Sequence, residues 1–235
     1  MKIKRAVTPL GKRRKKPVLV VLAGPNGAGK STFHENFIAH HGLPFVNADL
    51  IAKDMASKGK QISDVGAAKL AGKIRQEYLE KRKDFCMETV FSDSKGHKRD
   101  FLRLARRVGY VVILVFIGLD APEMSHARVK SRVEAGGHAV PPGKLDERFP
   151  RTIENLRLAI PHLDYVYLYD NSSYDNPYHP VVLCSFGKIR PLCRLIPSWV
   201  TKALPELLTH EGVEPLGVEE TLNDLLGFGG TNPNE

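Results

Sequence analysis

Cysteine and long apolar runs are both scarce in this sequence, and each scarcity excludes a class of protein. The 235 residues include only Cys86, Cys184 and Cys193, an odd number without the paired spacing of a zinc site. We therefore expect a reduced, cytoplasmic protein with no structural zinc. The longest apolar run covers ten residues, 110–119, against about 20 for a membrane-spanning helix, and no secretion signal follows the N-terminus. No membrane association is predicted.

Acidic and aromatic residues are absent from the first 16 positions. Residues 1–16 hold eight of the 35 Lys and Arg residues, which leaves 27 basic against 26 acidic residues in the rest of the chain. So little apolar material predicts a disordered basic tail. Nucleic acid, an anionic membrane or an acidic protein would attract such a tail. Because it has no ring to stack on bases, we favour a solvated arm over a nucleic-acid contact.

The stretch GPNGAGKST at residues 24–32 matches Gly-x-x-x-x-Gly-Lys-Ser/Thr at every fixed position. It follows the apolar run 18–23 and precedes a helical pattern, which is where a phosphate-binding loop belongs. Glycines let successive N–H groups face an anion, and the helix dipole adds to the attraction. The cofactors predicted are ATP or GTP and Mg²⁺, with Lys30 on the outer phosphates and Ser31 on the metal ion. The nucleotide-binding residues are Gly24, Pro25, Asn26, Gly27, Ala28, Gly29, Lys30, Ser31 and Thr32.

Strand and helix patterns alternate through most of the chain. Strands are expected at 18–23, 44–46, 85–87, 110–119 and 165–169, with one more at 181–186. Helices are expected at 30–41, 50–57, 63–83, 94–108, 122–135 and 145–160, with Ser94 as a cap. This order predicts an α/β fold, a doubly wound parallel sheet of about five strands with helices on both faces. The expected domain organisation is a tail (1–16), a P-loop kinase domain (17–190) and a C-terminal extension (191–235) with a short helix at 197–208 and a mobile end.

Polar residues follow the second and third expected strands, at the sheet edge where ligands bind in such folds. Asp49 is the candidate base that accepts a proton from the acceptor hydroxyl, although an N-cap role for the next helix explains it too. Glu88 would hold acceptor hydroxyls or a water of the metal shell, and an ordinary strand end is the alternative. Asn47 and Thr89 join Glu88 as candidate substrate-binding residues.

Two pairs of arginines flank an irregular Gly/Pro-rich loop at 136–144. Arg128 and Arg132 are four residues apart, and Arg148 and Arg151 are three apart, so each pair shares a helix face. We interpret them as a lid over the triphosphate, in which Arg132, Arg148 and Arg128 neutralise developing charge and Arg151 binds substrate. Solvated helix faces are the alternative. Residues 170–172 border the adenine or ribose in this interpretation, or form a plain polar turn.

The ATPase subunits of ABC transporters share the GPNGAGKST spelling, but they also carry an LSGGQ-type signature and a strand ending in Asp-Glu. This sequence has neither. A kinase is therefore favoured over a transporter ATPase.

Several blocks in a fixed order strengthen that interpretation: GPNGAGKST, NADLIA (47–52), ETVFS (88–92), HARVKSRVEAGGHAVP (126–141), RFPRTIENL (148–156) and LYDNS (168–172). Over about residues 18–187 the chain resembles the compact branch of the zeta toxin family of P-loop kinases. The resemblance implies a phosphotransferase that uses ATP or GTP and Mg²⁺, with UDP-N-acetylglucosamine as acceptor and an antitoxin as partner. It also implies that Asp49 is the catalytic acid of the Asn-x-Asp motif, Lys30 the loop lysine and Glu88 the strand-end acid. A nucleoside or polynucleotide-end kinase, or a P-loop NTPase switch without kinase activity, stays open as an alternative.

Overall fold

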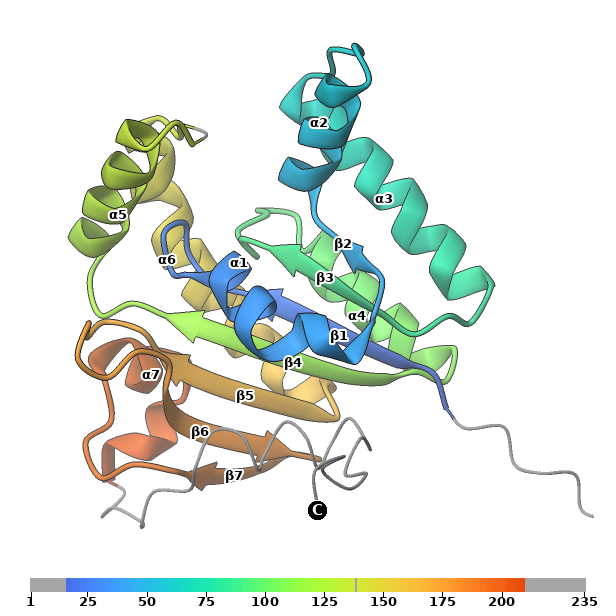
Figure 1. The fold of residues 1–235 in the computed structure, drawn as a ribbon. Coiled ribbons are helices and arrows are strands. Elements are labelled where there is room, and N and C mark those ends of the chain that lie inside the picture. Colours follow the sequence, from blue (N-terminus) through green and yellow to red (C-terminus); the bar gives the residue numbers. More distant parts are fainter. Residues whose placement is uncertain (1–15, 138, 210–235) are drawn as a thin grey trace, which may run out of the picture.

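A seven-stranded sheet in the order β2-β3-β1-β4-β5-β6-β7 runs through the protein (Figure 1). The computed structural model describes residues 16–137 and 139–209, so most of the expected tail and the expected mobile C-terminal end lie outside the described residues. The strands, in chain order, are β1 Val18–Ala23, β2 Phe45–Val46, β3 Phe85–Thr89, β4 Val111–Gly118, β5 Tyr165–Asp170, β6 His179–Ser185 and β7 Lys188–Pro191.

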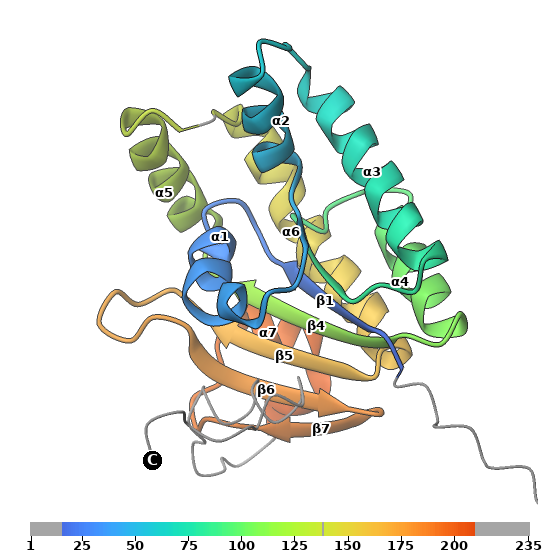
Figure 2. The same cartoon turned by 45° about the vertical axis from the view of Figure 1, so that its right-hand side comes forward.

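Helices connect the strands and cover both faces of the sheet. In chain order they are α1 Lys30–Phe33, η1 His34–Ile38, η2 Ala39–His41, α2 Ala48–Ser57, α3 Asp64–Glu80, α4 His97–Arg107, α5 Pro122–Glu134, α6 Pro142–Ala159, η3 Ile160–His162, α7 Ser198–Ala203 and η4 Pro205–Thr209. Residues of α3, α4, α6 and α7 form one core layer with the sheet, and residues of α1 and η1 form the other (Figure 2). The predicted α/β fold is confirmed.

The strands from β2 to β5 are parallel, as predicted, and β1 lies between β3 and β4 at the centre. Five residues of β1 and seven of β4 are buried, which is why both read as unbroken apolar runs in the sequence. The sheet is larger than predicted because β6 and β7 extend it in antiparallel pairing. The turn between them is Phe186-Gly187, both with positive φ (47° and 78°), and so short a link can join only antiparallel strands.

Three helix predictions need correction. The expected helix at 30–41 changes from α to π to 3₁₀ geometry along its length. Ser94 is not a helix cap: α4 begins at His97, whose backbone N–H donates to the Asp93 carboxylate at 2.6 Å. α6 begins at Pro142 rather than at residue 145, because proline suits the first helical position, where an N–H would have no helical partner.

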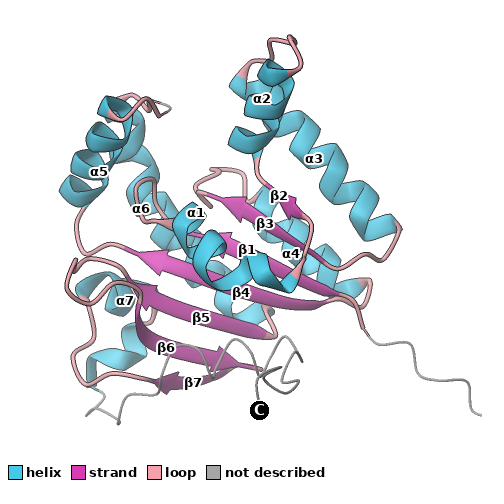
Figure 3. Cartoon of the chain, in the orientation of Figure 1, coloured by secondary structure: helices cyan, strands magenta, loops and turns pink. Residues whose placement is uncertain are grey.

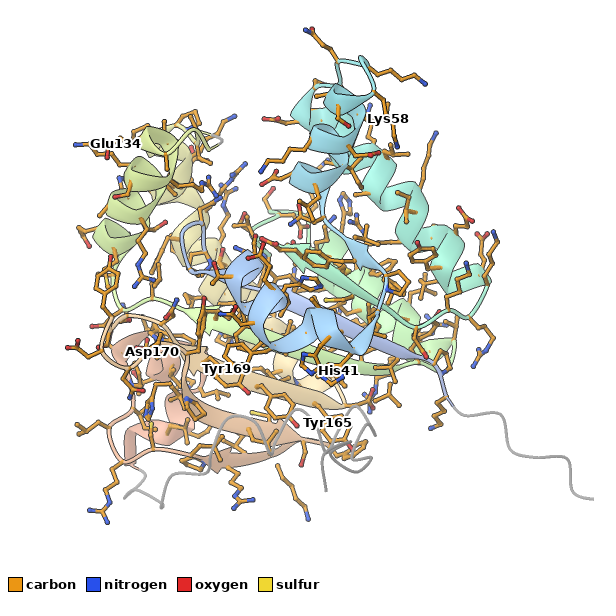
Figure 4. All side chains as sticks on the ribbon, in the orientation of Figure 1. His41, Lys58, Glu134, Tyr165, Tyr169 and Asp170 are labelled. Carbon is orange, nitrogen blue, oxygen red and sulfur yellow. The ribbon has the colours of Figure 1, made fainter. Side chains whose placement is uncertain are left out.

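The C-terminal part of the described chain packs on the same core as the rest. The expected boundary after residue 190 falls inside β7, and α7 buries Trp199 completely. The indole ring lies against Gly118 at the end of β4, where a Cβ atom would come within 2.3 Å of it, and its N–H donates to Asp170 at 2.7 Å. Figure 4 shows Asp170 and Tyr169 at one end of β5 and Tyr165 at the other.

All three cysteines are free and buried, and Cys86 lies inside β3 as predicted. Within the described ranges, no helix is both long and apolar enough to cross a membrane.

Candidate active site

The predicted phosphate-binding loop connects the carboxyl end of β1 to α1, at the edge where the loops after the parallel strands gather (Figure 3). Gly24, Gly27 and Gly29 all have positive φ, at 143°, 73° and 88°. A Cβ atom on Gly24 would lie 2.1 Å from the carbonyl oxygen of Ile117 in β4. Glycine is therefore required there both for its backbone conformation and for the close approach of the neighbouring strand.

Three side chains from distant parts of the chain hold the loop from outside. The Ser125 hydroxyl donates to Asn26 O at 2.6 Å, Asn171 Nδ2 donates to Ala28 O at 2.9 Å, and the Tyr178 hydroxyl donates to Gly29 O at 3.0 Å. Asn171 Oδ1 also accepts from the Tyr178 backbone N–H at 3.2 Å. The sequence interpretation missed Ser125 and Tyr178, since nothing local marks a residue that contacts a loop 99 or 149 positions away.

Residues 170–172, which we expect to border the adenine or ribose or to form a polar turn, make hydrogen bonds within the protein. Asn171 is buried and braces the loop, while Asp170 accepts hydrogen bonds from Trp199 and Ser172.

Lys30 is buried at 5% exposure, and its ammonium group is folded back onto the loop. Nζ donates to Gly24 O at 3.1 Å and to Pro25 O at 2.9 Å, and it lies 3.8 Å from Glu88 Oε1. Burial lowers the pKa of Lys30, an effect opposed by the nearby charges of Glu88 and Asp49 and reinforced by Arg132. Glu88, Asp49 and Arg132, which were predicted from separate motifs, therefore all lie within electrostatic reach of Lys30.

Glu88 connects the elements of the site. It lies in β3 beside Leu22 of β1, and its Oε2 accepts from the Ser31 hydroxyl at 3.1 Å and from Asn47 Nδ2 at 2.6 Å. These contacts bring the loop, the segment after β2 and the end of β3 together around one carboxylate. An ordinary strand end would not gather them, so the geometry favours the functional interpretation of Glu88.

Asp49 is exposed in the first turn of α2. The cap of that helix is Asn47, whose Oδ1 accepts from the backbone N–H groups of Asp49 at 2.8 Å and Leu50 at 3.2 Å. Because Asn47 caps the helix, the alternative interpretation of Asp49 as an N-cap is wrong. Its carboxylate is exposed and lies near enough to Lys30 for its negative charge to raise the pKa of that lysine.

The four arginines separate into two groups. On α5, the charge of Arg132 acts on Lys30, and Arg128 has its Cβ beside Gly27 and its guanidinium 5.0 Å from the ring centre of Tyr174. On α6, Arg148 and Arg151 line a cavity of about 570 Å³ together with Thr89. Arg151 is also paired with Glu147 at 2.9 Å. α5 and α2 both project above the sheet, with Glu134 and Lys58 at their far ends (Figure 4).

The walls of this cavity depend on two further α6 residues that the sequence did not single out. Asn155 Nδ2 donates to Phe91 O at 2.8 Å and to Asp93 O at 3.0 Å, and the Thr152 hydroxyl donates to Val90 O at 3.0 Å. The Thr89 hydroxyl accepts from the backbone N–H of Phe91. These hydrogen bonds fix the loop after β3, which forms one wall of the cavity.

The oxygen atoms beside the loop suit Mg²⁺. The Ser31 hydroxyl and the Glu88 carboxylate are 3.1 Å apart, and hard oxygen ligands of this kind, with phosphate oxygens and water, are what Mg²⁺ selects. In the described part of the chain, no cluster of three or more His, Cys, Asp and Glu residues forms a complete metal cage. That arrangement fits an ion bound mainly through the nucleotide.

A glycine loop of this geometry, at the carboxyl edge of a parallel sheet and before a helix, defines the class of P-loop nucleotide-binding proteins. The zeta toxin family model matches residues 4–177, and the chain belongs to that family. The resemblance inferred from the sequence is confirmed.

The chain is also similar to individual proteins. An uncharacterised protein of Haemophilus influenzae is 28% identical over 121 residues, which cover 52% of this chain and 84% of that protein. The AvrRxo1-ORF1:AvrRxo1-ORF2 complex matches in crystals with sulphate ions (TM-score 0.62, 18% identity, 93% of this chain and 72% of that one) and with ATP (0.61, 19%, 86% and 66%). The PezAT toxin-antitoxin system of Streptococcus pneumoniae matches with a TM-score of 0.55 and 16% identity over 93% of this chain and 87% of that one. At such identities the structural likenesses show the fold alone.

Proposed function

We propose that this protein is a kinase that transfers the γ-phosphate of ATP or GTP to a hydroxyl group of a small acceptor, with a UDP-amino sugar as the favoured acceptor. The observation that carries the proposal is the set of contacts around Glu88. They place the loop lysine, the loop serine and the Asn47–Asp49 segment around one carboxylate. In a kinase, these contacts would hold the phosphate-binding loop and the segment that carries the proposed base on either side of the transferred phosphate.

Residues 24–32 would bind the triphosphate through backbone N–H groups, with Lys30 leaving the carbonyls of Gly24 and Pro25 for the outer phosphates. Ser31 would hold Mg²⁺, with Glu88 holding acceptor hydroxyls or a water of the metal shell, and the ion neutralises charge on the phosphates when bound. Family membership and the ATP in the crystals of one similar protein support nucleotide binding. The experiment below determines whether the protein prefers ATP or GTP.

Asp49 would orient the acceptor hydroxyl and take its proton as the new P–O bond forms. Glu88, Asn47, Thr89 and Arg151 would position the acceptor, and Arg132, Arg148 and Arg128 would stabilise the charge on the transferred group. Of these, Arg132 has the most direct support, because its charge already acts on Lys30. Arg128 would have to leave the ring of Tyr174 to reach the phosphates.

The cavity beside Thr89 is the proposed acceptor site, since it opens next to the end of β3 and is lined by basic residues. A UDP-amino sugar offers both a hydroxyl for transfer and negative charge for such a lining. We further propose a cytoplasmic protein with a solvated tail at residues 1–16 and a catalytic domain that begins near residue 17 and includes β7 and α7, since Trp199 packs into the same core. A protein antitoxin is a fitting partner, because the similar PezAT structure comes from a toxin-antitoxin system.

Turnover with γ-labelled ATP and with γ-labelled GTP tests the proposal. UDP-N-acetylglucosamine, other UDP-sugars, nucleosides and DNA ends are offered as acceptors with Mg²⁺, and Lys30→Ala is the control. We expect label on a UDP-sugar that disappears in the Lys30→Ala protein. If the label appears only on nucleosides or DNA ends, the acceptor is one of these and not a UDP-sugar. If the label appears only as free phosphate, the protein is an NTPase switch and not a kinase.

A further inference from the structure

Aromatic and basic side chains share one face of the sheet where β5, β6 and β7 lie side by side. Directly paired residues of neighbouring strands project to the same face, and the next residue along each strand projects to the other. Cys184 of β6, for example, belongs to the opposite, buried face. The pairing places two rows of side chains together, which we call the β5–β7 face: Tyr165, Ser185 and Lys188 in the first row, and Tyr167, Leu183 and Arg190 in the second.

Lys188 and Arg190 on the β5–β7 face are exposed cations, and neither forms an ion pair or a side-chain hydrogen bond with a residue in the described ranges. The helical segment that begins with α1 covers the same face nearer the centre of the sheet (Figure 1), where Phe33 contacts Tyr169 with ring centres 5.2 Å apart. Lysine on an edge strand often protects against pairing with another chain. That role needs no aromatic residue nearby, whereas this face has an exposed ring at its margin.

That ring is Phe186, at the turn that joins β6 to β7. It is 65% exposed, and its φ of 47° lies in the left-handed region that such turns usually fill with Asn, Asp or Gly. Its ring meets that of Tyr165 at an angle of 68°, with ring centres 5.1 Å apart, so Tyr165 holds the exposed ring in place. Neither the turn nor the buried core accounts for an aromatic residue at this position.

The exposed ring lies at the edge of the sheet opposite the phosphate-binding loop. β5 begins at this edge, β6 returns to it in antiparallel pairing, and β1 and β4 also begin there. Lys16 before β1 and Arg107 before β4 are both exposed, which adds positive charge along the edge. The basic residues of the tail at 1–16 join the chain here too, and they would attract a polyanion over a long range while staying solvated.

We propose that the β5–β7 face binds single-stranded nucleic acid, with bases stacking on Phe186 and backbone phosphates bound by Lys188 and Arg190. Rings accept the face of any base, and cations follow the backbone, so little sequence preference is expected. The tail has no ring for stacking, and the sheet supplies one. Because the site lies at the edge opposite the proposed active site, the nucleic acid is a bound partner and not the phosphate acceptor. An anionic membrane shares the charge, but one exposed ring offers too little apolar surface for insertion.

Fluorescence anisotropy of the full chain with labelled oligothymidylate and oligouridylate tests the proposal, with the P-loop filled by Mg²⁺ and a non-hydrolysable ATP analogue. Phe186→Leu keeps an apolar side chain and removes the ring, and we expect it to weaken binding about tenfold without changing the salt dependence. Lys188→Gln combined with Arg190→Gln removes two phosphate contacts and should reduce the slope of log affinity against log salt concentration by about 1.4 in magnitude. The matched controls are Tyr174→Leu, which removes an exposed ring at the opposite edge, and Lys73→Gln on an exposed part of α3, and they should change neither quantity.

Thermal unfolding excludes a fold defect as the cause of weaker binding, and Tm should match that of the unsubstituted protein because every substituted side chain is exposed. Ultraviolet cross-linking to an oligonucleotide that contains iodouracil locates the site directly, and we expect adducts on the peptides that carry Tyr165 or Phe186. Equal affinities and slopes in all variants would show that the basic tail alone attracts the oligonucleotide, and the proposal would be overturned. It also fails if the unsubstituted protein binds neither oligonucleotide, or if it binds only vesicles that contain phosphatidylserine, which would identify a membrane-binding face.

Discussion

Asn47 Nδ2 lies 2.6 Å from Glu88 Oε2, while Oδ1 of the same side chain accepts from the backbone N–H of Asp49 at 2.8 Å. One amide therefore fixes the strand-end acid of β3 to the first turn of the helix that carries the proposed base. The distance between the two carboxylates is set by a residue that is itself uncharged.

Replacing Asn47 tests this link. Asn47→Ala removes the bond to Glu88 and the two bonds from the backbone N–H groups of Asp49 and Leu50, and it should lower the free energy of unfolding by about 1–2 kcal/mol through loss of the cap. Asn47→Asp keeps the acceptor for the Asp49 N–H but brings a second carboxylate against Glu88. We expect Asn47→Asp to retain much of the stability and to lose turnover. Equal turnover of Asn47→Asp and the unsubstituted protein would show that the contact with Glu88 has no part in catalysis.

Asp49→Asn should separate chemistry from binding. The amide cannot accept the hydroxyl proton, so kcat is expected to fall about 10²–10⁴-fold. ATP affinity, measured by calorimetry, should change little because the loop is intact. Asp54→Asn, at an exposed position further along α2, is the matched control. An Asp49→Asn protein with normal turnover would remove Asp49 as the base.

The lowered pKa of Lys30 predicts a stability effect with a definite sign. Because the folded state disfavours the charged lysine, its burial destabilises the protein most at pH values below the folded pKa, and this cost fades as the pH rises toward the usual value of 10.5. Lys30→Met should therefore raise Tm at pH 7 while abolishing ATP binding, and the gain should shrink toward pH 10. If the gain in Tm is the same at pH 7 and pH 10, its cause is better packing of methionine and not the loss of a buried charge.

The braces on the phosphate loop should affect nucleotide affinity. Tyr178→Phe removes the bond to Gly29 O and is expected to cost about 1 kcal/mol of stability. Asn171→Ala removes both of its buried bonds and should cost about 1–3 kcal/mol, with weaker ATP binding in each variant. Tyr165→Phe, at the opposite end of β5, is the control and should leave affinity unchanged (Figure 4). Unaltered ATP binding in Asn171→Ala would mean that the loop keeps its shape without the brace.

The contact between Gly118 and Trp199 predicts a compensating pair. Gly118→Ala introduces a Cβ atom 2.3 Å from the indole and should be strongly destabilising. Trp199→Ala leaves a cavity and should cost about 3–5 kcal/mol. The double variant should lose less than the sum of the two, as measured in a denaturant cycle. Strict additivity would contradict the packing described.

Local sequence patterns predicted the parts of this protein that depend on interactions between residues close together in the sequence. The loop at residues 24–32 is recognisable because its glycines and lysine serve a phosphate within one turn of chain. The strands β1 and β4 are recognisable because burial on both faces leaves continuous apolar runs. The start of α4 was misplaced because Ser94 suits a cap by residue type, whereas the helix begins after Gly96 and the Asp93 carboxylate accepts from the backbone N–H of His97.

By itself, the sequence determined the α/β class, the nucleotide loop and the family, because each depends on residue types in a fixed order. Only the tertiary structure showed how the candidate side chains contact one another and which distant residues support the loop. Asn171 and Tyr178 brace the loop from about 145 positions away, and Asn47, a site candidate from the sequence, connects Glu88 to the first turn of α2.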